Sequence, residues 1–309
     1  MTAQIPRILN FGDAAIAEAA ALIQAGGIVA VPTETVYGLA ADATNADAVA
    51  RIYAAKGRPS FNPLIVHLPD LQAAERIAHV DAAARALAER WWPGPLTLVL
   101  PLRPDMGIAG LVTAGLDTIA LRVPAHRAMQ ALLSASGRPL AAPSANASNA
   151  ISPTRAAHVA ASLGTRVPLI LDDGPTTAGL ESTIVGFGAG SGAILRPGPI
   201  TADQLGLPAA PKDDRITAPG QLATHYAPAK PLRLDARERQ GDEWLIGFGA
   251  ITGDDTLSAA GDPVEAAARL FDALHRADAA QPPRIAIAPV PGEGIGEAIN
   301  DRLRRAAHR

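Results

Sequence analysis

The fold is decided by a loop and strand that read Lys56-Gly-Arg-Pro-Ser-Phe-Asn-Pro-Leu-Ile-Val-His67. Before this stretch, residues 44–55 place apolar side chains at helical spacing, with Thr44 or Asn45 as the N-cap, which predicts a helix ending at Lys56. A lysine in the last turn, a glycine after it and a proline shortly beyond form an ordinary helix stop. The apolar run that follows predicts a strand ending on His67, so helix, loop and strand form one α/β unit.

The polar residues of this loop are only partly explained by helix termination. Arg58, Ser60 and Asn62 lie between prolines, where a helix stop requires neither a second cation nor two polar side chains. From the loop alone, anion binding and a solvated surface turn both remain open.

The rest of the chain continues the alternation of helices and strands. Apolar periodicity and turn signals predict helices over 13–25, 71–77, 82–90, 126–136, 263–274 and 298–307, and strands over 28–31, 96–100, 118–123, 139–142, 169–171, 184–185, 194–197, 244–248 and 285–288. Residues 201–231 show little periodicity. We therefore expect a large domain over 1–205, a linker or lid loop over 206–230, and a smaller domain over 231–309.

Composition excludes several classes of protein. The 309 residues are 48% hydrophobic and 18% charged, which is typical of a globular chain, and the formal net charge of -3 argues against a generally basic nucleic-acid coat. The absence of cysteine removes disulfides, thiol nucleophiles, zinc ribbons and iron–sulfur clusters. There is no signal-peptide pattern and no apolar run long enough to cross a bilayer, so we expect a cytoplasmic protein without membrane contact.

Polar residues follow several predicted strands. Thr33, Glu34 and Thr35 come directly after the strand 28–31, at the kind of strand end where open α/β sheets bind ligands. The two threonines could instead cap a turn. Arg122 lies within an apolar strand, where a charge is costly unless it is paired or near an anion, and an ion pair with Asp117 is the alternative.

Further polar loops lie beyond residue 140. Pro143 to Ser148 follows a strand and continues to Ser152 and Thr154, either of which could cap the next helix. The glycines of 186–192 do not precede a helix, so they indicate a hairpin rather than a dinucleotide loop. The glycines of 292–296 indicate a strand-to-helix turn, although they could cradle a phosphate. Arg196 follows the hairpin, and His225 and Tyr226 stand out in the long connection.

Together these loops carry Lys56, Arg58, Arg122 and Arg196 as separated cations. No phosphate-binding Gly-x-x-x-x-Gly-Lys-Ser/Thr loop, kinase signature or His-Glu-x-x-His is present. The arrangement suits an extended polyanion together with a small carboxylate better than a single phosphate.

At this level of detail the chain resembles the threonylcarbamoyl-AMP synthase family in its longer Sua5 form. The resemblance is carried, in order, by Pro32–Leu39, Lys56–His67, Trp92–Leu98, Arg122–Pro124, Pro143–Asn146, Glu181–Val185, Leu195–Gly198 and His225–Pro228. It implies an α/β fold: a YrdC-like twisted, mixed open sheet with flanking helices, and a smaller Rossmann-like α/β C-terminal domain.

The resemblance also implies a reaction. L-Threonine, bicarbonate or CO2 and ATP would condense to threonylcarbamoyl-AMP and pyrophosphate, for the threonylcarbamoyl modification of adenosine in tRNA. Mg2+ would accompany ATP, with no tightly bound organic cofactor and no metal ligand from the protein. Downstream tRNA threonylcarbamoyl-transfer proteins would accept the product, and direct contact with tRNA stays open.

Site residues follow from the same resemblance. The threonine pocket would consist of Thr35, His67, Arg122, Ala142 and Ser182, with Arg122 clamping the carboxylate. The ATP contacts would be Arg58, Asn62, Thr118, Ser144, Asn146, Ser152, Arg196 and Tyr226, with Tyr226 on a closing loop. Lys56 and Arg58 would face the phosphates as the catalytic cations.

Two other functions agree with parts of the sequence. A carbamoyl-transfer domain of the hydrogenase-maturation type carries cysteine-rich zinc modules, and this chain has no cysteine. A non-catalytic RNA-binding YrdC-like module is disfavoured by the acidic net balance, and it gives the grouping of Arg122, Ser182 and His67 no purpose.

Overall fold

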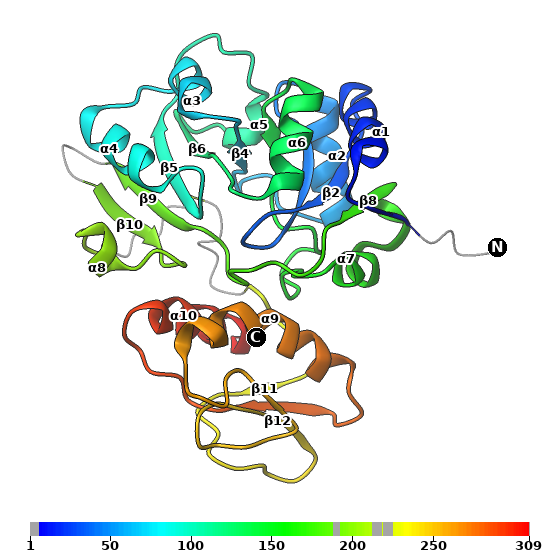
Figure 1. Cartoon of the computed structure of the whole chain (residues 1–309), viewed down its shortest axis with the longest axis vertical. Helices are drawn as coiled ribbons and strands as arrows, with labels where there is room; N and C mark the ends of the chain where they lie inside the picture. The colour runs from blue at the N-terminus through cyan, green and yellow to red at the C-terminus, as the bar shows by residue number, and fades with distance from the viewer. Residues whose placement is uncertain (1–5, 188–191, 212–217, 219–224, 309) are drawn as a thin grey trace.

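Two separate β-sheets organise the chain in the computed structural model, which describes residues 6–187, 192–211, 218 and 225–308 (Figure 1). The larger sheet has ten strands in the order β1-β8-β2-β3-β7-β4-β6-β5-β9-β10. Both parallel and antiparallel neighbours occur in it, so the sheet is mixed as predicted. Its strands are β1 (Arg7–Asn10), β2 (Val29–Pro32), β3 (Tyr37–Asp42), β4 (Ile65–His67), β5 (Leu96–Pro101), β6 (Thr118–Arg122), β7 (Leu140–Ala141), β8 (Leu169–Asp172), β9 (Thr183–Phe187) and β10 (Gly192–Arg196).

Helices cover both faces of this sheet. They are α1 (Asp13–Gln24), α2 (Ala46–Lys56), α3 (Leu71–Ile77), α4 (Ala82–Trp91), α5 (Gly110–Thr113), α6 (Arg127–Ser136), α7 (Ala156–Leu163), a 3-10 turn (Gly164–Arg166) and α8 (Ala202–Leu205). Helices α1 and α6 pack on one face of β2, β7 and β8, whereas α2 and α7 pack on the other. The strand β2 is therefore buried on both faces, which explains its continuous apolar sequence.

The period-2 alternation of two central strands creates the polar face on which the pocket lies. Val66 of β4 and Leu64 just before the strand belong to the main core, whereas Ile65 and His67 point to the opposite face. Strand β6 pairs with β4 in parallel, and its last residue, Arg122, lies opposite His67 of β4. The two polar side chains thus stand side by side at the ends of neighbouring strands.

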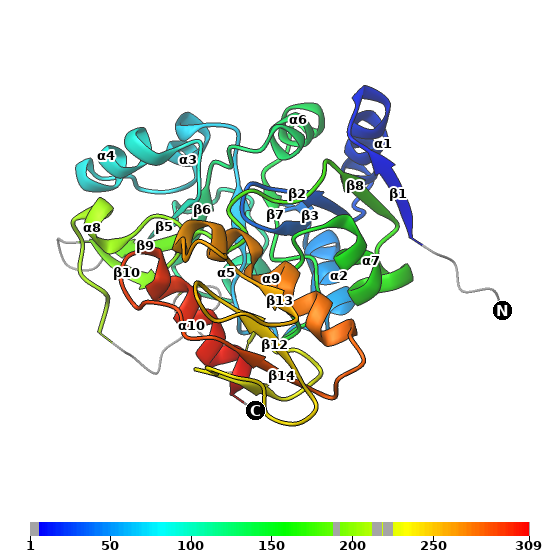
Figure 2. The ribbon, with the colours of Figure 1, turned by 60° about the horizontal axis from the view of Figure 1, so that its bottom comes forward.

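The smaller sheet is entirely parallel, in the order β11-β14-β12-β13 (Figure 2). Its elements are β11 (Leu232–Arg233), β12 (Glu243–Gly247), β13 (Asp255–Thr256), α9 (Pro263–Ala279), β14 (Arg284–Ile287) and α10 (Ile295–Ala307). Helices α9 and α10 lie between this sheet and the large domain (Figure 1). Apolar residues of both parts, including Leu180, Tyr226 and Phe271, share one buried cluster there.

Local signals placed most helices correctly. Helix α2 begins after Asn45, whose side chain accepts from the Ala48 amide, and ends at Gly57 in a left-handed conformation. Asp262 caps α9 as its sequence predicts. The cap predicted for α7 was wrong, because that helix begins after Arg155, and the Thr154 hydroxyl lies 3.4 Å from Nδ1 of His158.

Strand β3 is not among the predicted strands. Thr33 to Val36 turn. Tyr37 to Ala40 pair antiparallel with β2, and Ala41 and Asp42 pair antiparallel with β7. The predicted glycine hairpin joins β9 and β10, which are antiparallel, but its residues 188–191 lie outside the described residues. Most of the predicted linker, 212–217 and 219–224, also lies outside them. No helix in the described ranges is long and apolar enough to span a membrane.

Candidate active site

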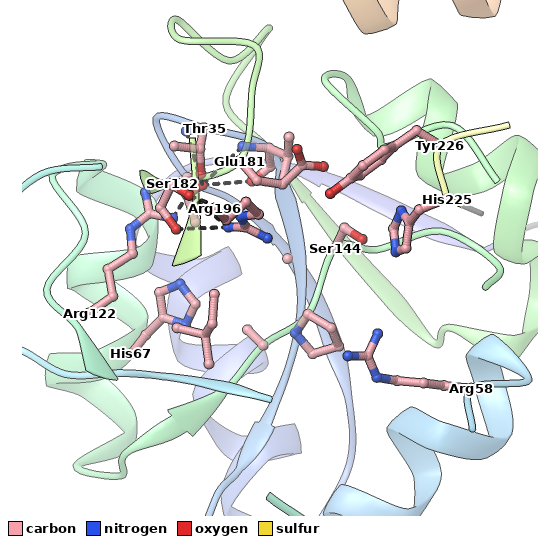
Figure 3. Close-up of a pocket in the computed structure, with 16 residues that line it drawn as sticks. Thr35, Arg58, His67, Arg122, Ser144, Glu181, Ser182, Arg196, His225 and Tyr226 are labelled. Carbon is pink, nitrogen blue, oxygen red and sulfur yellow. Dashed lines mark hydrogen bonds between the residues drawn. The ribbon is translucent and has the colours of Figure 1, made fainter. Parts of the chain in front are cut away.

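A pocket lies over the face of β4 and β6 that carries His67 and Arg122 (Figure 3). Strand ends and the loops after them supply nearly all of its walls, as the position of the polar loops predicts. The lining residues are Thr33, Thr35, Val36, Gly38, Arg58, Ile65, His67, Arg122, Ala142, Pro143, Ser144, Glu181, Ser182, Arg196, His225 and Tyr226.

Arg122 is held from three sides. Its Nη2 donates to Oε1 of Glu34 at 2.6 Å, its Nη1 to Thr35 Oγ1 at 2.9 Å, and its Nε to the Gly94 carbonyl at 3.2 Å. The alternative partner Asp117 was wrong, because Glu34 forms the ion pair. A guanidinium has five N–H groups, so each terminal nitrogen keeps one for a ligand. That pair of donors matches a carboxylate.

Glu34 stays charged beside this guanidinium. Burial raises the pKa of its carboxyl, but the Arg122 charge and hydrogen bonds outweigh burial and leave the pKa below its ordinary value. Its second oxygen accepts from the Ala125 amide at 3.2 Å. The pair is therefore a fixed wall of the site, and both side chains are largely buried.

His67 lies next to Arg122 and is uncharged at neutral pH. Burial, reinforced by the Arg122 charge, lowers the pKa of His67 to about 3. Its Nδ1 is buried and finds no hydrogen-bond partner within the described part of the chain. Beside it lie Ile65 and Ala142, so this end of the pocket combines a two-donor fork with a small uncharged wall. Such a wall suits a short aliphatic side chain with a hydroxyl.

Arg58 approaches from the opposite side of the pocket (Figure 3). Its own loop braces it, because Nε donates to the Asn62 carbonyl at 3.2 Å and Nη2 to the Pro63 carbonyl at 2.9 Å. Burial lowers the pKa of Arg58, although an arginine remains charged at neutral pH. Asn62 thus acts through its carbonyl, and its side chain is buried outside the pocket lining.

Arg196 lies deeper, behind Ser182. Its Nη2 donates to the Ser182 carbonyl at 2.8 Å and to Ser182 Oγ at 3.1 Å, and Ser182 Oγ lies 2.7 Å from Thr97 Oγ1. Burial lowers the pKa of Arg196 to about 10, so it remains a cation at neutral pH. Because none of the hydrogen bonds described above uses Nη1, that nitrogen can serve a ligand.

Lys56 does not line the pocket. Its side chain is buried, and Nζ donates to the carbonyls of Ser144 at 2.6 Å and Asn146 at 2.5 Å. Burial holds the pKa of Lys56 well below its ordinary value. Lys56 therefore fastens the end of α2 to the loop that presents Ser144 to the pocket.

His225 and Tyr226 close the pocket at the side of the long connection. The Tyr226 hydroxyl points toward the pocket (Figure 3), and it has no hydrogen-bond partner among the described residues. Tyr226 adopts a positive φ of 65°, and its ring packs 5.5 Å from that of Phe271 on α9. Burial raises the pKa of Tyr226 and holds that of His225 well below its ordinary value. Both side chains are therefore uncharged at neutral pH.

Glu181 is the carboxylate of the pocket wall. Its Oε1 accepts from Ser152 Oγ at 2.5 Å and its Oε2 from Arg302 Nε at 2.8 Å. Burial raises its pKa, but Arg302 and Arg196 outweigh burial and leave the pKa below its ordinary value. Ser152 thus reaches the pocket only through Glu181.

The structure brings most of the predicted site residues together. The pocket is lined by Thr35, Arg58, His67, Arg122, Ala142, Ser144, Ser182, Arg196 and Tyr226. Lys56, Asn62, Asn146, Ser152 and Thr118 lie outside its lining, the first four as supports or in the layer behind it, and Thr118 at the far end of β6.

Sequence reasoning had not assigned seven lining residues to the site. They are Thr33, Val36, Gly38, Ile65, Pro143, Glu181 and His225. Thr33, Glu181 and His225 lay in polar segments already singled out, and Ile65 follows from the alternation that brings His67 into the pocket. Val36, Gly38 and Pro143 lie within the stretches Pro32–Leu39 and Pro143–Asn146 that carry the family resemblance, but no sequence signal gave them a role in the site.

Acidic side chains and histidines do not gather into a metal site in the part of the chain that the structure describes. Within the described ranges, no group of three or more His, Asp or Glu side chains could hold a metal ion. The two carboxylates closest to the site, Glu34 and Glu181, are already paired with Arg122 and Arg302.

Comparison with known proteins agrees with this geometry. Residues 21–198 match the sequence profile of a family described as "Telomere recombination" (Sua5, YciO and YrdC proteins), and 193–308 match "Threonylcarbamoyl-AMP synthase, C-terminal domain". The threonylcarbamoyl-AMP synthase of Bacillus subtilis (strain 168) is 40% identical, over 97% of this chain and 94% of the relative. That of Pyrococcus abyssi (strain GE5 / Orsay) is 39% identical, over 94% and 93%.

A solved structure shares the whole architecture. The crystal structure of P. abyssi Sua5 complexed with L-threonine superposes with a TM-score of 0.90 at 36% identity, over 97% of each chain. A variant of that protein with an adjacent His and Tyr replaced by Ala superposes with a TM-score of 0.89 at 34% identity, over 98% of this chain and 96% of that one. The only adjacent His–Tyr pair in the present sequence is His225-Tyr226.

Proposed function

This chain belongs to the Sua5 family of threonylcarbamoyl-AMP synthases, and from that premise we propose how its pocket performs the reaction. The function is that of a nucleotidyltransferase, which condenses L-threonine, bicarbonate or CO2 and ATP into threonylcarbamoyl-AMP and pyrophosphate. The product serves the threonylcarbamoyl modification of tRNA. The comparisons favour this catalytic function over a non-catalytic RNA-binding module.

The observation that carries the assignment is the division of the pocket's cations into two groups. Arg122 offers a two-donor fork beside the neutral His67, which suits the carboxylate and short side chain of threonine. Arg58 lies on the opposite side of the pocket from that fork (Figure 3), and Arg196 lies behind Ser182. Both keep N–H groups that none of the hydrogen bonds described above uses, as a polyphosphate requires. One site can therefore hold an amino acid and a nucleotide together.

We assign the threonine subsite to Thr35, His67, Arg122, Ala142 and Ser182, and the ATP subsite to Arg58, Ser144, Arg196 and Tyr226. Lys56, Asn62, Asn146 and Ser152 would support the ATP subsite through the contacts described above, and Thr118 is retained as an ATP contact on resemblance alone. Arg58 remains the proposed catalytic cation, whereas Lys56 would act by holding the Ser144 loop.

The substrate supplies its own nucleophile. The threonine amine adds to CO2 and loses a proton to give a carbamate, whose oxygen attacks the α-phosphorus of ATP. An oxygen–phosphorus bond forms, the bond to the β-phosphate oxygen breaks, and pyrophosphate leaves. Catalysis then requires positioning and cations that stabilise the departing charge, which agrees with the absence of a nucleophilic triad in the described pocket.

Several finer assignments complete the proposal. Mg2+ would arrive on the phosphates of ATP and shield their charge. Residues 1–205 would form the catalytic domain, 206–230 the linker that ends near Tyr226, and 231–309 the C-terminal domain, in a cytoplasmic enzyme. Proteins that transfer threonylcarbamoyl groups to tRNA would consume the product.

A direct assay tests the function. The purified chain is incubated with ATP, Mg2+, bicarbonate and labelled threonine, and both pyrophosphate and labelled threonylcarbamoyl-AMP are measured. We expect pyrophosphate release that depends on threonine and bicarbonate. Tight RNA binding without threonine-dependent pyrophosphate release would instead favour the RNA-binding module.

A further inference from the structure

The C-terminal helix α10 inserts a fully buried arginine beside the pocket. Arg302 has a relative exposure of 0% and heads the largest fully buried side chains of the described chain. Burying such a cation is costly unless partners compensate for the lost water. Its partners therefore indicate why it is there.

Three of the four described partners of Arg302 lie outside its own domain. Its Nε donates to Glu181 Oε2 at 2.8 Å and its Nη2 to the Pro197 carbonyl at 3.1 Å. Its guanidinium also lies 5.2 Å from the ring centre of Tyr226. Within its own helix it pairs with Asp301 at 2.6 Å. Two of these contacts, Glu181 and Tyr226, are pocket-lining residues.

Glu181 poses an electrostatic problem for the proposed reaction. Its carboxylate lies in the wall of a pocket that must accept an anionic nucleotide, and like charges in a buried site repel strongly. Ser152 can donate a hydrogen bond to this carboxylate but cannot cancel its charge. Arg302 is the cation in direct contact with it.

We propose that Arg302 is a positioning residue of the ATP subsite, which neutralises Glu181 and so makes the C-terminal domain a working part of the active site. This inference rests on the proposed function, because it assumes that the pocket receives ATP. It goes beyond that function because it assigns a residue of the C-terminal domain to the binding of ATP.

The competing explanation is that Arg302 only holds the two domains together. Other contacts already do this. Arg155, after the Ser152 loop, forms an ion pair with Asp272 on α9 at 2.9 Å. The Arg155 side chain is 48% exposed, and it does not line the pocket. It is therefore a matched control: an arginine–carboxylate pair across the same interface that does not touch the site.

The test is a double-mutant cycle read out in substrate affinities. The variants Arg302→Met, Glu181→Gln, the double variant and Arg302→Lys are compared with Arg155→Ala and the unmodified chain. KM is measured separately for ATP and for threonine, binding of a non-hydrolysable ATP analogue is titrated, and thermal unfolding reports the folded fraction.

Arg302→Met should raise the KM for ATP roughly tenfold or more and the KM for threonine by less than about threefold, because it leaves a buried carboxylate unpaired next to the nucleotide. The double variant should recover ATP affinity to within roughly threefold of the unmodified chain, since it removes both charges together. Arg302→Lys keeps the charge, so its KM for ATP should lie between those of Arg302→Met and the double variant. Arg155→Ala should leave the KM values for both substrates unchanged.

Three outcomes would overturn the inference. They are an unchanged KM for ATP in Arg302→Met, an equal rise for both substrates, and a double variant no better than Arg302→Met. If Arg302→Met does not fold, the KM values of Arg302→Lys and of the double variant are compared with those of the unmodified chain, and the same criteria apply to them. Failure of the proposed function is separate, because the unmodified chain would then show no threonine-dependent turnover.

Discussion

The Nη2 atom of Arg122 lies 2.6 Å from Oε1 of Glu34, at the end of β6 and beside the pocket. A carboxylate of the protein thus occupies one side of the guanidinium and orients the remaining N–H groups toward the cavity. This arrangement explains how a charged side chain is tolerated in an otherwise apolar strand. It also makes the orientation of Arg122 independent of substrate.

Replacing Arg122 with Ala should weaken threonine binding by roughly 2 to 5 kcal/mol, since a two-donor, charge-assisted contact to the carboxylate is lost. ATP binding should change much less, because Arg58 lies on the opposite side of the pocket and Arg196 makes none of the hydrogen bonds of this fork. Calorimetric titration of each ligand measures both effects. Arg127→Ala, which removes an exposed pair with Asp173, is the matched control and should affect neither ligand. An equal loss for both ligands would remove Arg122 from the carboxylate role.

The Tyr226 hydroxyl provides a second prediction, because it is buried without a partner in the described part of the chain. Tyr226→Phe should leave the free energy of unfolding unchanged or raise it by up to about 1 kcal/mol, and should raise the KM for ATP several-fold. Tyr37→Phe is the opposite case, since its hydroxyl already donates to the Gly174 carbonyl at 2.7 Å. That variant should lose stability without the change in KM. Denaturant unfolding and steady-state kinetics distinguish the two patterns.

Much of the site could be predicted because polar residues at strand ends are visible in the sequence. Thr35, Ser144 and Arg196 each follow or end a strand, and the sheet gathers these ends into one pocket. Strand β3 escaped prediction for a physical reason. Apart from Tyr37 and Leu39, its residues are Gly38, Ala40, Ala41 and Asp42, which all have low β-propensity. The strand is therefore specified by its neighbours β2 and β7 rather than by its own propensity.

The role of each site residue was harder to predict than its position near the pocket. Lys56 and Asn62 stand in the right loop, but whether a side chain faces the cavity or supports a neighbour depends on contacts far away in sequence. Lys56 reaches the carbonyl of Ser144, 88 positions along the chain, and Arg302 reaches Glu181 over 121 positions. No local pattern encodes such pairings, which is why the contribution of α10 to the pocket appeared only in the structure.

The buried His67 should make stability depend on pH. Burial, reinforced by Arg122, lowers its pKa in the folded chain to about 3, whereas the unfolded chain takes up the proton near the ordinary value of about 6.5. Between these values the unfolded state binds more protons, so the free energy of unfolding falls as the pH falls. Each such histidine adds a slope of up to about 1.4 kcal/mol per pH unit.

His67→Gln should reduce this slope, measured by denaturant unfolding between pH 6 and 5, where few carboxyls titrate. His275 contributes in the same direction, because burial, reinforced by His158, lowers its pKa to about 3 as well. The His67 variant should therefore flatten the dependence without abolishing it. A slope identical to that of the unmodified chain would contradict a neutral His67.

Lys56 and Lys230 form a matched pair that distinguishes support from catalysis. Each is a lysine whose Nζ donates to two backbone carbonyls: Lys56 to Ser144 and Asn146 beside the pocket, Lys230 to Ala277 and Ala280 at the end of α9. Replacing either with Met should cost about 1 to 3 kcal/mol of stability, the value of two hydrogen bonds. Only Lys56→Met should also raise the KM for ATP, because it releases the loop that presents Ser144. If Lys56→Met instead lowered kcat by several orders of magnitude with KM unchanged, Lys56 would act on the transition state itself, and its assignment as a support would be wrong.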